Sequence, residues 1–233
     1  MTDWSLTLSA PAKINLYLGV HTERDDRGYH KVDSLMAAGG LVALAELWGI
    51  DRADPALDNI ARGIGADVPF FLHASPAFYV GGGDVLATEY PALPATPVVL
   101  VKPREASVST IEAYRRFDEA PVPADEPGAI ASALRAGDAE TAYALIHNNL
   151  GVISAQMEPR IQTVLDWLRS QDGTITANVC GSGACSFAIC DTAATAVNLA
   201  AAAQQNGWWA YATELVSDTV RIEGLISDLS RTH

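Results

Sequence analysis

An alternation of apolar and polar residues near the start of the chain places the strongest constraint on its fold. The alternation begins at Leu6, is interrupted at Pro11, and continues through four apolar residues: Ile14, Leu16, Leu18 and Val20. A period of two predicts a β-strand with one buried face, and it places Lys13, Asn15 and Tyr17 on the opposite face. Burying a lysine and an asparagine beside a core strand is costly unless they bind a partner. The alternative is a lysine whose ammonium group reaches solvent from a sheet edge.

Strands and helices are mixed along the rest of the chain. Apolar runs bounded by turn residues predict strands at 30–36, 77–86 (a hairpin around Gly81–Gly83), 98–101, 174–179, 185–190 and 211–214. Amphipathic spacing predicts helices at 54–63, 110–117, 129–136, 139–150, 157–168 and 192–206. Three prolines at 91, 94 and 97 interrupt the pattern, and we place a domain boundary there, between residues 1–90 and 91–233.

Two of the expected helices carry clear positional signals. Asp54 as N-cap and Pro55 in the first turn predict the start of one helix, which ends at Gly63. Its expected buried face holds Leu57, Ile60 and Ala61. A second helix carries a stripe of core residues: Met157, Ile161, Val164, Leu165 and Leu168.

Between Met36 and Ala37 the pattern changes from strand to helix without a turn, cap or loop. Residues 30–36 predict an incoming strand, whereas residues 37–48 have the periodicity of a helix interior. Consecutive elements need a connection. We therefore expect the protein to have further residues between Met36 and Ala37.

Composition narrows the class of protein. With 49% apolar and 18% charged residues, the 233-residue chain is expected to fold into one large domain or two small ones. Its net charge of −13 argues against nucleic-acid binding, which needs clustered Lys and Arg. We expect no signal peptide and no membrane span, and hence a cytoplasmic protein. The three cysteines have no zinc-binding spacing and are expected to be buried thiols.

An isolated carboxylate, Asp67, lies among small and apolar residues in the stretch Gly65–Phe71. One interpretation is an N-cap, since Asp followed by Pro often opens a helix. The other is an ion pair with a distant cation in an equally apolar setting, and Lys13 is such a cation. The stretch alone favours the cap; the presence of Lys13 favours the pair.

Four stretches in order resemble the GHMP kinase superfamily, and within it the kinases of cytidine-diphosphate-linked sugar alcohols in the non-mevalonate isoprenoid pathway. The stretches are Pro11–Leu16, Gly28–His30, Gly65–Phe71 and Gly181–Gly183. The resemblance implies a two-domain α+β fold, with helices packed on mixed or antiparallel sheets. It assigns ATP binding to residues 1–90 and substrate binding to residues 91–233. It also implies ATP-dependent phosphorylation of a 2-hydroxyl with Mg²⁺, in a monomer or weak homodimer that binds neither nucleic acid nor membrane.

Residue roles follow from the same resemblance. Asp67 would accept the hydroxyl proton, and Lys13 would stabilise both Asp67 and the developing charge. The implied substrate contacts are Asn15, Tyr29, His30, Thr110 and Tyr114, with the base held between the two tyrosines. Gly181, Ser182 and Gly183 would brace the nucleotide-phosphate loop. The superfamily's Gly/Ser-rich loop itself is absent, and we expect it among the residues missing directly before Ala37.

Two other functions fit the same residues. One is a different GHMP kinase, of the mevalonate or homoserine type, which would not need the aromatic pair Tyr29 and Tyr114. The other is a ligand-binding relative without catalysis, which would have no use for a lysine–aspartate pair.

Overall fold

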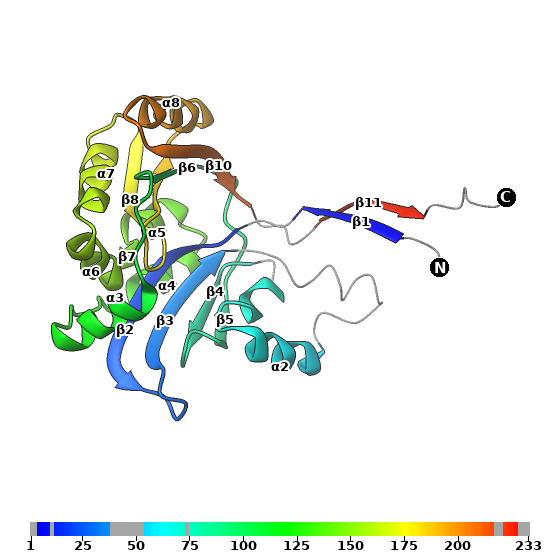
Figure 1. Ribbon diagram of the computed structural model, residues 1–233. Helices are drawn as coiled ribbons and strands as arrows, with labels where there is room; N and C mark the ends of the chain where they lie inside the picture. Colours follow the sequence, from blue (N-terminus) through cyan, green and yellow to red (C-terminus); the bar gives the residue numbers. More distant parts are fainter. Residues whose placement is uncertain (1–3, 10–11, 38–53, 73–74, 217–220, 228–233) are drawn as a thin grey trace.

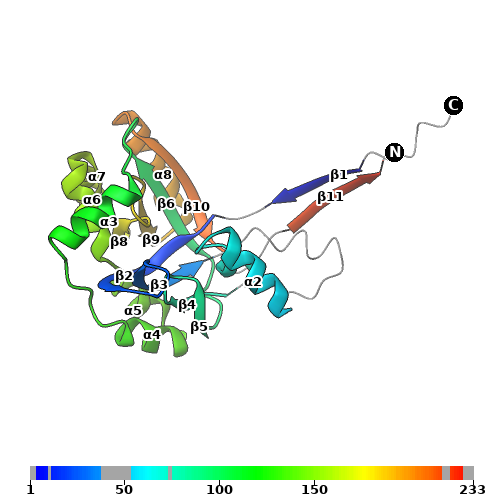
Figure 2. The same ribbon diagram turned by 60° about the horizontal axis from the view of Figure 1, so that its bottom comes forward.

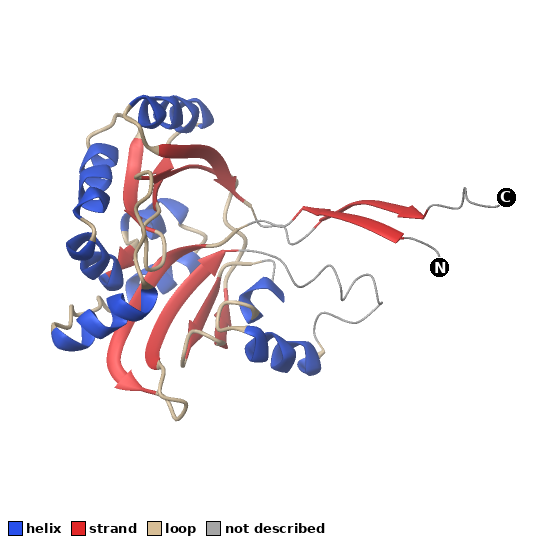
Figure 3. Ribbon diagram, in the orientation of Figure 1, coloured by secondary structure: helices blue, strands red, loops and turns tan. Residues whose placement is uncertain are grey.

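The computed structural model describes residues 4–9, 12–37, 54–72, 75–216 and 221–227, in which strands and helices form an α+β fold (Figures 1 and 3). The strands are β1 (Trp4–Ser9), β2 (Ile14–Arg24), β3 (His30–Ala37), β4 (Ala77–Val80), β5 (Val85–Glu89), β6 (Thr96–Lys102), β7 (His147–Asn148), β8 (Thr174–Val179), β9 (Ser186–Cys190), β10 (Trp209–Leu215) and β11 (Arg221–Ser227). The helices are α2 (Pro55–Ile64), the 3₁₀ turn η1 (Pro69–Leu72), α3 (Thr110–Glu119), α4 (Gly128–Arg135), α5 (Ala139–Ala144), α6 (Asn149–Met157), α7 (Pro159–Arg169) and α8 (Ala193–Gln205).

A five-stranded mixed sheet has the order β5-β4-β3-β2-β7, with β7 parallel to β2 and the other pairs antiparallel. The expectation that β2 has only one buried face is wrong, because every residue from Ile14 to Val20 is buried. Tyr17 is 1% exposed and packs in one cluster with Ile130, Leu134 and Tyr143 from the helices α4 and α5. The face that carries Asn15 and Tyr17 is therefore covered by a later part of the chain.

A four-stranded antiparallel sheet has the order β10-β6-β9-β8, and α7 and α8 cover one of its faces (Figures 1 and 3). Ile161, Val164, Leu165 and Leu168 pack there as predicted. Met157 ends the preceding helix α6 and packs on a different cluster, so its place in the expected stripe is wrong. Phe187 and Ile189, on β9, share a core cluster with Tyr17, which joins the two sheets.

Strand β3 runs through the Met36–Ala37 junction. Met36 lies opposite Asn15 and Ala37 opposite Ile14 in the antiparallel pair with β2. Ala37 is therefore the last residue of a strand, and the prediction that it lies inside a helix is wrong. The rest of that expected helix, residues 38–48, falls outside the described residues. The prediction of missing residues at this junction stays a prediction.

The expected helix 139–150 is divided in the structure. Helix α5 ends at Ala144, the short strand β7 pairs with Tyr17 and Leu18, and α6 begins at Asn149. The division has a local cause, since the Asn148 side chain accepts a hydrogen bond from the Gly151 N–H and caps α6. Strand β2, before the expected boundary near residue 91, pairs with β7, after it. The division into domains 1–90 and 91–233 stays a prediction.

Helix α2 begins as predicted, with Asp54 accepting from the Ala56 N–H and Pro55 in the first turn. It ends one residue later than expected, at Ile64. Leu57 and Ala61 are buried, but Ile60 is 56% exposed and does not belong to the buried face.

Strands β1 and β11 form a separate antiparallel ribbon that projects from the rest of the molecule in both views (Figures 1 and 2). Among the described residues these two strands pair only with each other. No helix in the described part of the chain is long and apolar enough to cross a membrane.

Candidate active site

The structure brings Lys13 and Asp67 together although they are far apart in the sequence. Lys13 immediately precedes β2, and Asp67 lies in the turn between α2 and η1. Lys13 Nζ lies 3.3 Å from Asp67 Oδ2, with the lysine side chain 19% exposed and the carboxylate side chain 57% exposed. The ion-pair interpretation of Asp67 is thereby the one that the geometry favours. An exposed carboxylate beside a largely buried ammonium group is accessible to a substrate.

Asn15 connects this pair to the sheet. Its Oδ1 accepts a hydrogen bond of 2.9 Å from Lys13 Nζ, and its Nδ2 donates one of 2.7 Å to Ser34 Oγ on β3. Asn15 and Ser34 are each only 2% exposed. The buried amide therefore fixes the position of the lysine.

The loop that connects β8 to β9, residues 180–185, approaches Asn15. Gly181 and Gly183 have φ of 57° and 81°, in the left-handed region that favours glycine. A Cβ at Gly181 would lie 3.6 Å from Asn15 Oδ1, so the loop packs directly against the beginning of β2. Of the three predicted loop residues, Gly181 lies beside Asn15, whereas a Cβ at Gly183 would face Ile161, Val179 and Ser154. Burial raises the pKa of the flanking thiol Cys180.

Three polar side chains hold this loop, and sequence analysis missed two of them. Asn148 Nδ2 donates to the Gly181 carbonyl over 2.8 Å, and Ser154 Oγ donates to the Ser182 carbonyl over 2.8 Å. Thr110 Oγ1, which was predicted at the site, lies 2.9 Å from Ser182 Oγ. Asn148 lies inside the expected helix 139–150, and Ser154 lies between two expected helices. Neither sequence context gave a signal of this role.

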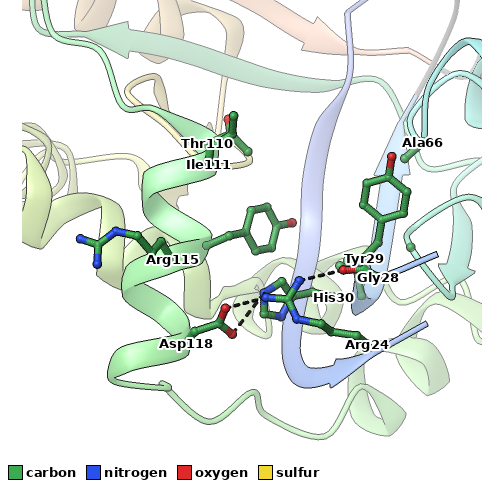
Figure 4. Close-up of a pocket in the computed structure, with 12 residues that line it drawn as sticks. Arg24, Gly28, Tyr29, His30, Ala66, Thr110, Ile111, Arg115 and Asp118 are labelled. Atoms are coloured by element: carbon green, nitrogen blue, oxygen red, sulfur yellow. Dashed lines mark hydrogen bonds and ion pairs between the residues drawn. The ribbon is translucent and has the colours of Figure 1, made fainter. Parts of the chain in front are cut away.

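A cavity of about 550 Å³ lies between α3 and the β2–β3 connection (Figure 4), and neither Lys13 nor Asp67 is among the residues that line it. It is lined by four of the predicted substrate residues: Tyr29, His30, Thr110 and Tyr114. Ala66, the neighbour of Asp67, lies on its wall. In Figure 4, Thr110, Arg115 and Asp118 come from α3, while Arg24, Tyr29 and His30 come from the β2–β3 side. Asn15, the fifth predicted contact, lies beside Lys13 and does not line the cavity.

The two tyrosines each have one face covered by the protein. Tyr114 is half-buried and stacks on His30, with ring centroids 5.1 Å apart and planes at 20°. Burial raises the pKa of Tyr114, and the charge of Asp67 contributes to this shift. Tyr29 is 64% exposed, and the Arg27 guanidinium lies 5.4 Å from its ring centroid. Both rings line the cavity, where a flat ligand could stack on them.

Arg24 and Asp118 are pocket residues that sequence analysis did not identify. Arg24 lies 2.6 Å from Asp118 and 3.0 Å from His30 Nε2. Their signal in the sequence is weak: Asp118 follows Tyr114 by one helical turn, and Arg24 is one of several charged residues in a turn. Within the described residues, no group of three or more His, Cys, Asp or Glu is placed to hold a metal ion.

The arrangement of sheets, loop and ion pair defines the class of protein. Residues 130–207, which include the Gly181–Gly183 loop, match the sequence model described as GHMP kinases C terminal. The fold is that of solved GHMP kinases, including a homoserine kinase from Cytophaga hutchinsonii with a TM-score of 0.60 at 14% identity, over 97% of this chain and 98% of that one. The chain belongs to the GHMP kinase superfamily.

More specific similarity is to 4-diphosphocytidyl-2-C-methyl-D-erythritol kinases. Curated proteins of that name share 34% identity over 180 residues in a Nocardioides species and 35% over 178 residues in a Caulobacter species. These alignments cover 71% and 74% of this chain, but 56% and 60% of the relatives. The chain thus spans less than two thirds of the length of these relatives. A solved 4-(cytidine 5′-diphospho)-2C-methyl-D-erythritol kinase has a TM-score of 0.69 at 25% identity, over 92% of this chain and 99% of that one.

Proposed function

We propose that the protein transfers a phosphoryl group from ATP to the 2-hydroxyl of 4-diphosphocytidyl-2-C-methyl-D-erythritol. The observation that carries the proposal is the Lys13–Asp67 pair, 3.3 Å apart, beside a cavity whose wall carries Tyr29 and Tyr114. A kinase that acts on a small alcohol needs a pair such as Lys13–Asp67, but it needs no aromatic site for a base. A substrate that carries a nucleobase also needs aromatic faces, and this site has two. The curated relatives of the chain carry the name of this activity.

The residues have distinct roles in the proposed reaction. Asp67 accepts the proton of the substrate hydroxyl as its oxygen attacks the γ-phosphorus of ATP. The bond from that phosphorus to the β-phosphate oxygen breaks, and ADP leaves. Lys13 stabilises Asp67 and the charge on the transferred group, and Asn15 holds Lys13 in place.

Thr110 and the loop Gly181–Gly183 are proposed to position the ATP phosphates and the substrate at the reacting end of the cavity. Their mutual contact, from Thr110 Oγ1 to Ser182 Oγ, joins α3 to the loop. Glycines in the left-handed region can turn N–H groups toward an anion. Because the chain has a net charge of −13, its overall field repels an anionic nucleotide. Local N–H donors are therefore needed to bind the phosphates.

ATP is proposed to bind together with Mg²⁺. In such sites Mg²⁺ is usually held by the nucleotide phosphates and one or two carboxylates. Because Asp67 is proposed as the proton acceptor, Mg²⁺ would be held mainly by the nucleotide phosphates and water. Bound Mg²⁺ would neutralise phosphate charge, while the other roles belong to the residues named above.

Three further properties are proposed on the same basis. The 1–90 part, completed by residues between Met36 and Ala37, binds ATP, and the 91–233 part contributes most of the substrate site. The protein acts in the cytoplasm. It functions as a monomer or weak homodimer, without nucleic acid or membrane.

A substrate comparison tests the proposal. ADP release would be measured with 4-diphosphocytidyl-2-C-methyl-D-erythritol, mevalonate and homoserine at equal concentrations. The proposal predicts a kcat/KM roughly 5- to 150-fold higher for the first, since loss of base stacking costs about 1–3 kcal/mol per base. Preference for either of the smaller alcohols would transfer the assignment to another GHMP kinase. Binding of the cytidyl compound without any ADP release would favour the ligand-binding relative.

A further inference from the structure

Two side chains without a role in the proposed reaction, Arg24 and Asp118, close around the edge of the His30 ring (Figure 4). Arg24 NH2 lies 3.0 Å from His30 Nε2, and Asp118 Oδ1 lies 3.2 Å from the same nitrogen. The other ring nitrogen, Nδ1, lies 2.8 Å from the carbonyl oxygen of His21. Since a carbonyl oxygen can only accept, Nδ1 carries a proton. Both nitrogens of this ring therefore have partners within the protein.

Two aromatic side chains of helix α3 also pack against the His30 ring. Tyr114 stacks on His30, and Phe117 contacts it edge-on with a centroid distance of 6.0 Å and an interplanar angle of 88°. Tyr114, Phe117 and Asp118 are spaced three and four residues apart, which places them on one side of α3. His30 is only 6% exposed. One buried imidazole thus sets how α3 lies against the beginning of β3.

Arg24 also holds the turn between β2 and β3. Arg24 NH1 donates a hydrogen bond of 2.7 Å to the Gly28 carbonyl, across the turn that carries Tyr29. Arg24 and His30 are also opposite each other in the β2–β3 pair. The Arg24–Asp118 ion pair of 2.6 Å therefore joins the turn that holds Tyr29 to the helix that holds Tyr114.

We propose that Arg24 and Asp118 are positioning residues that set the gap between the Tyr29 and Tyr114 rings, so that a pyrimidine base fits between them. The inference rests on the proposed function, because the base belongs to the proposed substrate. The His30 side chain, a predicted substrate contact, also helps to fix the wall of the cavity, because it lies between Tyr114 and the two charged side chains. Neither Arg24 nor Asp118 touches the reacting atoms.

The test uses the variants Asp118→Asn and Arg24→Gln in the full chain, with cytidine 5′-diphosphate and ATP as separate probes. Each variant should weaken cytidine diphosphate binding roughly three- to twentyfold, the range expected from losing one charge-assisted contact. The dissociation constant for ATP should not change. The double variant should bind no more weakly than the weaker single variant, because both changes break the same contact.

The matched control is Asp58→Asn on α2. Asp58 also pairs with an arginine, Arg62, over 2.8 Å, and its side chain is 32% exposed, compared with 38% for Asp118. The Asp58→Asn variant should leave cytidine diphosphate binding unchanged. A charge exchange, Arg24→Asp with Asp118→Arg, should recover part of the affinity lost in the single variants. This variant keeps the test decisive if a single substitution prevents folding.

The outcomes separate the two levels of the proposal. Wild-type protein that fails to bind cytidine diphosphate would overturn the proposed function itself. Wild-type protein that binds it, with both single variants equally tight, would overturn only the positioning role. A joint loss of cytidine diphosphate affinity, ATP affinity and thermal unfolding midpoint would also contradict it, since it would mean a purely structural contact.

Discussion

Asp67 is the residue on which the proposed chemistry depends most. Substituting Asp67→Asn keeps the side chain's size but removes the proton acceptor, so turnover should fall about 10²- to 10⁴-fold, the range for a general base. Cytidine diphosphate affinity should stay within about twofold of wild type, because Asp67 is not among the residues that line the cavity with the two tyrosines. Single-turnover kinetics and calorimetry measure the two quantities. Near-normal phosphoryl transfer by the variant would show that Asp67 is not the base.

Lys13→Met should reduce turnover at least as much, because it removes the partner of Asp67 and leaves the buried Asn15 amide without its donor. Arg160→Met provides the control. Its guanidinium also pairs with a carboxylate, Glu158, but at the beginning of α7 and outside the cavity lining. That variant should turn over at the wild-type rate, and an equal loss in both would indicate a general effect on folding.

Asp84 gives a prediction about stability rather than catalysis. It is 2% exposed and accepts hydrogen bonds of 2.7 and 2.9 Å from Arg27, which joins the β4–β5 turn to the β2–β3 turn. The Arg27 side chain holds the pKa of Asp84 below its ordinary value of 3.8. A carboxyl with a lowered folded-state pKa stabilises the protein above its unfolded-state pKa, and this contribution is lost as pH falls through the folded value.

Asp84→Asn should therefore lower the free energy of unfolding by about 1–3 kcal/mol at pH 7, the range for a hydrogen-bonded charged group. The difference from wild type should shrink below about pH 4, near the usual pKa of aspartate. Urea unfolding at a series of pH values measures it. A difference that stayed constant into acid would mean that the Asp84 charge does not contribute.

At the residue scale, the sequence predicted those site residues that stand out from their neighbours in the chain. Lys13 and Asp67 each stand as a lone charge in an apolar stretch, and this alone suggested that they meet. Arg24 and Asp118 stand among other charged residues, so their sequence context does not distinguish them from a solvated surface. Their contact with His30 depends on where α3 packs, and no local pattern encodes that.

The pocket lies between two elements, helix α3 and the β2–β3 connection, each of which supplies one aromatic ring. Tyr114→Ala or Tyr29→Ala should raise the KM for the cytidyl substrate roughly tenfold and leave the KM for ATP nearly unchanged, since stacking contributes about 1–3 kcal/mol per base. Phenylalanine at either position should be tolerated, because the ring face matters more than the hydroxyl. Steady-state kinetics with each substrate varied in turn checks both. Normal substrate KM in both alanine variants would remove the support for a nucleotide-linked substrate.

At the element scale, local signals predicted where helices and strands lie better than they predicted which elements pair or pack together. Asp54 and Pro55 marked the beginning of α2, and Gly81–Gly83 marked the β4–β5 hairpin. The division of residues 139–150 into three elements was not predictable, since β7 forms only by pairing with Tyr17 and Leu18, far away in the sequence. The second buried face of β2 has the same origin, because α4 and α5 cover it.

For the whole molecule, the ribbon of β1 and β11 supports the expectation of further residues. A two-stranded sheet is marginally stable by itself, and in the described part of the chain these strands have no other partner (Figure 2). We expect residues between Met36 and Ala37 to supply strands beside the ribbon, followed by a Gly/Ser-rich run. Intact-mass measurement of the protein from its source should then give more than 24.6 kDa. A mass that matches the sequence would contradict this expectation and favour the ligand-binding alternative.

The central claim is transfer of phosphate to one hydroxyl of a cytidyl sugar alcohol, and ³¹P NMR of the reaction mixture tests it most directly. The protein would be incubated with ATP, Mg²⁺ and 4-diphosphocytidyl-2-C-methyl-D-erythritol. The account predicts a new phosphomonoester resonance at the 2-position, formed in equal amount to ADP and absent with Asp67→Asn. ADP formed without that resonance, or an unchanged spectrum with wild-type protein, would contradict it.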